Sequence, residues 1–175
     1  SEFRYRQPVV RKGTAALAIS QSGETLDTLE AIREAKRNGA LILGVVNAVG
    51  STIARETDAG VYNHAGPEIS VASTKAFFSQ VTILALITLF LGRERGMSKE
   101  TGVRLAEGIA ALPALAQKVL DQSENIKKVA LKYASSRDFL FIGRRYSHPV
   151  ALEGALKLKE LSYVHADGCP AGEMK

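Results

Sequence analysis

The sequence predicts an α/β fold in which a parallel sheet is flanked by helices. Two unbroken apolar runs, TAALAI at residues 14–19 and LILGVV at 41–46, have the length and composition of buried strands. Between them, apolar residues recur at helical spacing, namely Leu26, Leu29, Ile32 and Ala35. Unbroken apolar strands that alternate with helices are typical of parallel sheets covered on both faces.

The first half of the chain continues this alternation. The helix that begins near residue 26 is expected to end at Asn38 and Gly39. A short helix within residues 51–57 and a short strand near Val61 and Tyr62 follow the second strand. Residues 76–91 (AFFSQVTILALITLFL) are shorter than most membrane spans, so we predict a buried core helix that starts near residues 73–74.

The second half begins with helices and returns to the α/β pattern. A helical region from Ser98 is expected to be interrupted by Pro113, and Ser123 is a plausible cap for a helix to about residue 133. The strand FLFI (139–142) precedes a helix with Pro149 in its first turn, ending near residue 161, and then a partial extended segment. We therefore predict three parts: residues 1–95, connecting helices at 96–136, and the start of a second α/β unit at 137–175.

Composition disfavours several classes of protein. The formal charge of +5 comes from basic residues that are spread along the chain, without interleaved aromatics and without Trp, so we predict no nucleic-acid partner. A single cysteine, Cys169, excludes an internal disulfide, and no residues have zinc-ligand spacing, so no metal is expected. The N-terminus has no signal-peptide pattern and no Met, which indicates a cytoplasmic chain without a membrane anchor, cut from something longer.

The loop AISQSGETLDT (18–28) is the first candidate binding site. Hydroxyls of Ser20, Ser22 and Thr25 follow the first strand, at the edge where parallel sheets bind ligands. Together with free N–H groups at the start of the next helix they could bind a phosphate, although neither a P-loop nor a GxGxxG motif is present. Alternatively, Ser22 or Thr25 only caps this helix, with Glu24 favoured in its first turn, and the loop leaves both interpretations open.

A comparable loop, AGPEISVASTK (65–75), follows the next short strand. Two hydroxyl-rich loops at successive strand ends can converge on one ligand, and a sugar phosphate fits better than a nucleotide because no aromatic platform for a base is apparent. The alternative is that Thr74 caps the following helix and Lys75 is a solvated charge.

A third motif is VALEGALKLKELSYVHADG (150–168). Glu153, Lys157 and Glu160 are spaced i, i+4 and i+7 and share one helical face. Such a group could transfer protons if it lines a cleft, or it could be a salt-bridged surface stripe. His148 and His165 are interpreted as structural, and Cys169 has no base beside it.

Five segments together closely resemble the isomerase half of the glutamine:fructose-6-phosphate aminotransferase (glucosamine-6-phosphate synthase) family: SEFRYR, SQSGETLDTL, GPEISVASTKAF, ALEGALKLKELSYVHA and AGEMK. The resemblance covers nearly the whole chain. It implies a three-layer, flavodoxin-like fold of sugar-isomerase (SIS) type, truncated at both ends, with residues 1–95 forming most of a first SIS subdomain without its first strand. It also implies that a glutaminase domain of the same parent chain supplies ammonia, which a cytoplasmic homodimer uses to convert fructose 6-phosphate to glucosamine 6-phosphate without metal or organic cofactor.

The resemblance also implies roles for eight residues. Ser20, Gln21, Ser22 and Thr25 would bind the sugar phosphate, Val71 and Ser73 would line the sugar, and Glu160 would be the base that moves a proton between C1 and C2, assisted by Lys157. A Cys-Gly-Thr-Ser loop of the family would precede Ser1, and a ring-opening histidine would follow Lys175, so the chain alone is expected to be inactive.

Three hypotheses remain beside these assignments. The chain could be a non-catalytic SIS module that senses phosphosugars, or a structural piece without ligand affinity. We also predict that residues 138–143 pair into the first sheet in place of the missing strand and bury Phe139 and Phe141 there, because an uncovered sheet edge promotes association.

Overall fold

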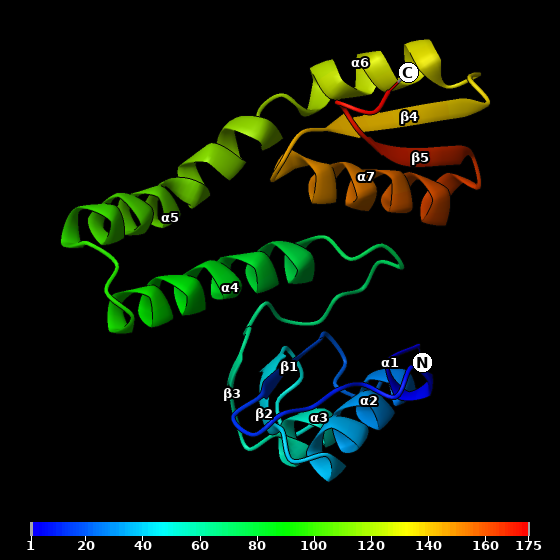
Figure 1. Ribbon diagram of the computed structural model, residues 1–175. Coiled ribbons are helices and arrows are strands. Elements are labelled where there is room, and N and C mark those ends of the chain that lie inside the picture. Colours follow the sequence, from blue (N-terminus) through cyan, green and yellow to red (C-terminus); the bar gives the residue numbers. More distant parts are fainter. Residues whose placement is uncertain (1, 175) are drawn as a thin grey trace. The chain divides into compact units, whose positions relative to one another are not determined.

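A computed structural model describes residues 2–174, which form two compact units (Figure 1). The first unit comprises residues 2–69 and 74–102, and the second comprises residues 70–73 and 103–174. The three parts predicted from the sequence, with boundaries at 95/96 and 136/137, stay a prediction.

The first unit contains a three-stranded parallel sheet. Strands β1 (Ala15–Ser20), β2 (Leu41–Val46) and β3 (Ala59–Tyr62) are adjacent in that order, with Ala15 opposite Leu41 and Leu43 opposite Ala59. The helix α1 (Glu2–Tyr5) precedes β1, whereas α2 (Leu26–Arg37) and α3 (Thr52–Glu56) connect the strands. The predicted α/β fold with parallel pairing is confirmed.

The core of this unit lies between the sheet and its two connecting helices. Leu29, Ile32 and Ala35 of α2 are buried against Ile42 and other residues of β2, and Ile53 of α3 joins the same cluster. The apolar positions that predicted α2 are thus its buried face. The opposite face of β1 is open, since Leu17 and Ile19 are about 40% exposed, so the predicted covering of both faces is wrong for this strand.

The long apolar helix differs from its prediction. Helix α4 (Lys75–Glu94) forms as expected, but among its residues only Ala76 is buried. The predicted buried core helix is therefore wrong in the described chain. Apolar composition favours burial, yet burial needs a second packed surface. By length and composition alone, α4 is the one helix within residues 2–174 that could cross a membrane, which is weak evidence for a span.

The second unit contains a second parallel sheet. Strands β4 (Asp138–Gly143) and β5 (His165–Pro170) pair along their whole length, with α7 (Ser147–Ser162) as the crossover. The predicted pairing of residues 138–143 with the first sheet is wrong, because β5 supplies a parallel partner only one helix away. Phe139 and Phe141, which lie on β4, are half-buried in the second unit.

Two helices lead into this sheet, α5 (Lys99–Leu120) and α6 (Ser123–Tyr133). Pro113 lies inside α5, so the predicted interruption is wrong; a proline removes one backbone donor and strains the preceding turn, and here the helix continues through it. Ser123 is the first residue of α6, not its cap, since Gln122 occupies the N-cap position, where it makes no side-chain capping bond.

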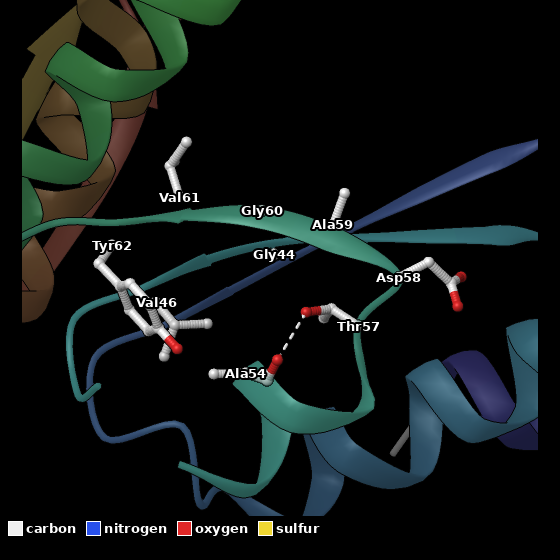
Figure 2. A pocket seen from close by; sticks show the side chains of 9 residues that line it. All are labelled: Gly44, Val46, Ala54, Thr57, Asp58, Ala59, Gly60, Val61 and Tyr62. Carbon is white, nitrogen blue, oxygen red and sulfur yellow. Dashed lines mark hydrogen bonds between the residues drawn. The ribbon is translucent and has the colours of Figure 1, made fainter. Parts of the chain in front are cut away.

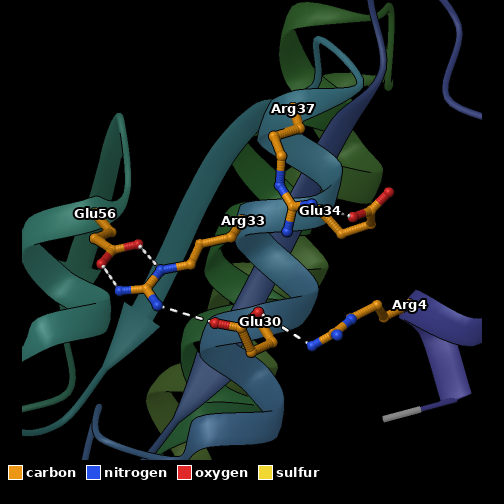
Figure 3. Close-up of polar contacts among 6 residues, drawn as sticks. All are labelled: Arg4, Glu30, Arg33, Glu34, Arg37 and Glu56. Atoms are coloured by element: carbon orange, nitrogen blue, oxygen red, sulfur yellow. Dashed lines mark hydrogen bonds and ion pairs between the residues drawn. The ribbon is translucent and has the colours of Figure 1, made fainter.

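An ion-pair network joins the helices of the first unit (Figure 3). Arg33 of α2 donates to both carboxylate oxygens of Glu56 on α3, at 2.9 and 2.5 Å, and to Glu30 at 2.9 Å. Nearby, Asp58 accepts bonds from the Ile42 backbone N–H at 2.8 Å and from Lys36 Nζ at 2.9 Å. These contacts fix α2 and α3 against the amino ends of β2 and β3.

Acid is expected to weaken this unit. The hydrogen bond from Arg33 lowers the pKa of Glu56, and the Ile42 N–H bond lowers the pKa of Asp58. Because both pKa values are lower in the folded chain, their stabilisation is complete above the unfolded values of about 4 and is lost as the pH falls through the folded ones. Urea midpoints measured at pH 7, 5 and 3 should fall mainly below pH 4, and Asp58→Asn with Glu56→Gln should flatten that dependence. A midpoint that falls equally in the double variant would contradict this explanation.

Candidate functional site

The hydroxyl-rich loop at residues 20–25 follows β1 directly. Buried Ser20 accepts a hydrogen bond on Oγ from the Gly23 N–H at 3.0 Å, and Ser22 Oγ accepts one from the Glu24 N–H at 3.2 Å. Thr25 occupies the N-cap of α2 but makes no side-chain cap bond. The serines therefore shape the loop, and the side chain of the cap residue does not occupy the first N–H groups of α2. The predicted capping of α2 by the Thr25 hydroxyl is therefore wrong, and phosphate binding by the loop stays a prediction.

Gly23 allows the loop to approach α3 closely. Its φ of +66° is in the left-handed region, and a Cβ at this position would lie 1.9 Å from Ser51 Oγ. The Ile53 N–H donates to the Gly23 carbonyl at 2.9 Å. A side chain at position 23 would therefore displace the loop from its support.

A cavity of about 500 Å³ opens beside this loop, at the carboxyl ends of the strands. It is lined by residues that follow β1, β2 and β3: Gln21, Asn47, Ala48, Val49, His64, Gly66 and Pro67. Asn47 holds the wall in place, because its Nδ2 donates to the Gly66 carbonyl at 2.8 Å and its Oδ1 accepts from the Ala65 N–H at 2.9 Å. The edge predicted to bind ligand thus carries a cavity that includes Gln21.

Sequence reasoning missed Asn47 and left His64 without a role. Asn47 stands one residue after β2, as Gln21 stands one residue after β1, so its position at a strand end was the available signal. His64 has a φ of +52°, which is uncommon for a residue other than glycine. That conformation cannot be read from periodicity.

The second predicted loop is organised by Glu68. Its carboxylate accepts hydrogen bonds from the Ala76 N–H at 3.0 Å and the Thr74 N–H at 3.3 Å, and the Ala76 bond lowers the pKa of Glu68. Thr74 is at the N-cap of α4 without a side-chain cap bond, so the predicted capping by its hydroxyl is wrong. Glu68, six residues earlier, satisfies these N–H groups because the loop folds back on the helix. Val71 is 87% exposed, and Ser73 is half-buried.

The charged residues of α7 form one cluster. Lys157 Nζ lies 2.6 Å from Glu160 Oε2 and 3.4 Å from Glu153 Oε1, as the spacing predicted. The hydrogen bond with Glu160 raises the pKa of Lys157, to which Glu153 adds a smaller contribution. The side chains of the three residues are only about a quarter to a third exposed. The predicted ion pairs are therefore confirmed, whereas a role in proton transfer stays a prediction.

The eight predicted residues fall into two groups. Loop 20–25 in the first unit carries Ser20, Gln21, Ser22 and Thr25, whereas Val71, Ser73, Lys157 and Glu160 belong to the second unit. Within residues 2–174, no group of three or more His, Cys, Asp or Glu side chains could hold a metal ion.

A second cavity, of about 250 Å³, lies beside β3 (Figure 2). Its floor is the close pair of Gly44 and Gly60, where a Cβ on Gly60 would lie 2.3 Å from the Gly44 carbonyl oxygen. The carboxylate of Asp58 lies in its wall and already accepts hydrogen bonds from the Ile42 N–H and from Lys36 Nζ. None of the predicted site residues lines this cavity, and its Thr57 hydroxyl donates to the Ala54 carbonyl at 3.1 Å.

Comparisons with known proteins agree with this geometry. The SIS domain family profile matches residues 1–90 and 132–175. The chain is 56% identical over 176 residues to a glutamine–fructose-6-phosphate aminotransferase [isomerizing] of Thermus thermophilus, covering 100% of this chain and 29% of that protein. The corresponding protein of Chlorobaculum tepidum is 51% identical over 175 residues, and the chain covers 28% of its length. The chain thus spans less than a third of the length of these relatives.

A solved structure is also similar. The C-terminal domain of glucosamine-fructose-6-phosphate aminotransferase from Francisella tularensis matches 99% of this chain with a TM-score of 0.95 and 38% identity, over 49% of that chain. The chain therefore corresponds to about half of that solved structure.

Proposed function

Because the chain belongs to the SIS domain family, we propose that it is the fructose 6-phosphate-binding part of the isomerase half of a glutamine:fructose-6-phosphate aminotransferase. The observation that carries this proposal is the loop at residues 20–25. Its hydroxyls and the N-terminus of α2 meet at the carboxyl end of a parallel strand, a combination of donors that can bind a phosphate. The relatives' printed names and the 56% identity support the choice of this reaction.

In the proposed reaction, ammonia condenses with the C2 carbonyl of fructose 6-phosphate and the product isomerises to glucosamine 6-phosphate. The condensation releases water and leaves an imine at C2; the carboxylate of Glu160 then removes a proton from C1 and returns it to C2, while the C1 hydroxyl proton passes to the nitrogen, so the step is balanced without a redox partner. The Lys157 ammonium, bonded to Glu160, offsets the negative charge of the carboxylate and orients it. Ser20, Gln21, Ser22 and Thr25 hold the phosphate, and Val71 and Ser73 line the sugar.

The remaining parts of the proposal concern the whole protein. Ammonia comes from a glutaminase domain of the same parent chain, the enzyme is a cytoplasmic homodimer, and this chain alone is inactive. A non-catalytic phosphosugar sensor is the alternative, and the identity to enzymes favours catalysis over it.

Ser22→Ala tests the phosphate site directly. We expect the wild-type chain to bind fructose 6-phosphate in calorimetric titration and to bind unphosphorylated fructose far more weakly. Removing the Ser22 hydroxyl should weaken binding of the phosphate ester about tenfold, because a charge-assisted hydrogen bond and the loop's Glu24 contact are both lost.

Ser135→Ala, at an exposed position after α6, is the matched control and should bind as the wild type does. If the chain alone does not bind fructose 6-phosphate, the same titration with the full-length protein decides whether loop 20–25 binds the phosphate. Equal affinity for fructose and fructose 6-phosphate there would refute the phosphate site.

A further inference from the structure

The side chain of Glu24 does not interact with the helix that follows it in sequence. Its Oε1 instead accepts a hydrogen bond from the Thr52 N–H, at the first residue of α3, over 2.8 Å. The two residues are 28 positions apart, so this is a tertiary contact. Acidic residues are favoured near the start of a helix, but this preference does not explain the position of the Glu24 side chain, which bonds to α3 and not to α2.

The backbone of the loop is attached to the same segment. The Asn47 and Ala48 N–H groups donate to the carbonyls of Ser20 and Gln21, each at 3.1 Å, and the Ile53 N–H donates to Gly23. Loop 20–24 thus rests on residues 47–53 along its length. Glu24 contributes a side-chain contact at the end nearest α2, where the backbone bonds stop.

The placement of the Glu24 charge also matters for an anion. A carboxylate directed at the first turn of α2 would occupy the N–H groups that a phosphate needs and would repel it. Bonding to Thr52 turns Glu24 away from that turn, and the N–H bond with the nearby charge of Arg55 lowers the pKa of Glu24. The carboxylate is held against α3, where its charge is compensated, and it is directed away from the first turn of α2.

From these contacts we propose that Glu24 is a positioning residue for the substrate phosphate, which fixes loop 20–25 on α3 and directs its own charge away from the start of α2. This inference rests on the proposed function but names a residue that the family resemblance did not assign. Glu24 itself does not touch the substrate.

The test compares Glu24→Ala, Glu24→Gln and Asp58→Ala in the full-length protein that carries this chain. Asp58 is the matched control, because its carboxylate also accepts a backbone N–H bond across the sheet, at the amino ends of the strands. We expect Glu24→Ala to raise the KM for fructose 6-phosphate about tenfold with kcat changed less than about twofold, since phosphate binding is remote from the reacting carbons. Glu24→Gln, which keeps an acceptor oxygen, should stay within about threefold of wild type.

Asp58→Ala should lower the urea midpoint and leave this KM unchanged. An unchanged KM in Glu24→Ala, or an equal loss in Glu24→Gln and Glu24→Ala, would overturn the positioning role while leaving the proposed function intact. A wild-type protein that forms no glucosamine 6-phosphate would count against the proposed function instead. Titration with inorganic phosphate still tests Glu24 in that case: about tenfold weaker binding by Glu24→Ala supports the role, and equal binding refutes it.

Discussion

Glu160→Gln in the full-length protein is expected to lower the kcat for glucosamine 6-phosphate synthesis by a factor of about 10² to 10⁴, the usual contribution of a general base. The KM for fructose 6-phosphate should change little, because the amide has the same shape and the phosphate binds elsewhere. The new amide oxygen can still accept the bond from Lys157, which lies 2.6 Å from Glu160 in the wild type. The readout is steady-state formation of glucosamine 6-phosphate with ammonia supplied from glutamine.

Glu153→Gln is the control for this substitution. Glu153 shares the helical face and contacts the same lysine at 3.4 Å, so its loss changes the charge around Lys157 to a similar degree. We expect its kcat to remain within about threefold of wild type. Unchanged synthesis in Glu160→Gln would remove Glu160 as the base and favour the phosphosugar-sensing alternative, whereas equal losses in both variants would point to the charge cluster as a whole.

Gly23→Ala is expected to weaken fructose 6-phosphate binding about 10²-fold, because a displacement of about 1 Å in a binding loop is enough for such a loss. The new Cβ would lie 1.9 Å from Ser51 Oγ and 2.9 Å from Val46 Cγ1, so the loop must leave α3. The φ of +66° adds a backbone cost of about 1 to 2 kcal/mol for a residue with a side chain. Calorimetric titration and urea unfolding measure the two effects separately.

Two further variants separate the clash from the backbone cost. Gly39→Ala carries a similar φ of +86° with no atom within 4 Å of the new Cβ, so it should lose stability without losing affinity. Combining Gly23→Ala with Ser51→Gly removes the two closest clashing atoms, leaves Val46 Cγ1 at 2.9 Å, and should recover part of the binding. If the double variant binds no better than Gly23→Ala alone, contact with Ser51 is not the cause of the defect.

The sequence was informative wherever a local rule decides the outcome. Apolar runs and helical spacing predicted β1, β2 and α2, because the residues that share one face of a helix or strand are set by residue order alone. The spacing of Glu153, Lys157 and Glu160 predicted their ion pairs for the same reason. Hydroxyl groups at a strand end identified loop 20–25, but their chemistry left capping and phosphate binding as equal explanations.

Tertiary structure decided the features that depend on distant partners. Helix α4 is apolar by composition, yet its exposure follows from which surfaces are packed against it. Strand β4 pairs with β5 and not with the first sheet, since hydrogen-bonding partners are chosen by proximity in space. Glu68 replaces Thr74 as the cap of α4 because the loop folds back.

By itself, the sequence determined the α/β class, most element positions, the family and the residues that could carry chemistry, all of which follow from local periodicity and motif identity. Only the tertiary structure decided that Ser20 and Ser22 bond within their own loop, that Glu24 binds the backbone of α3, and that Asn47 holds the wall of the cavity. The physical reason is that a hydrogen bond is specified by distance and direction, and residues far apart in sequence acquire these only when the chain has folded.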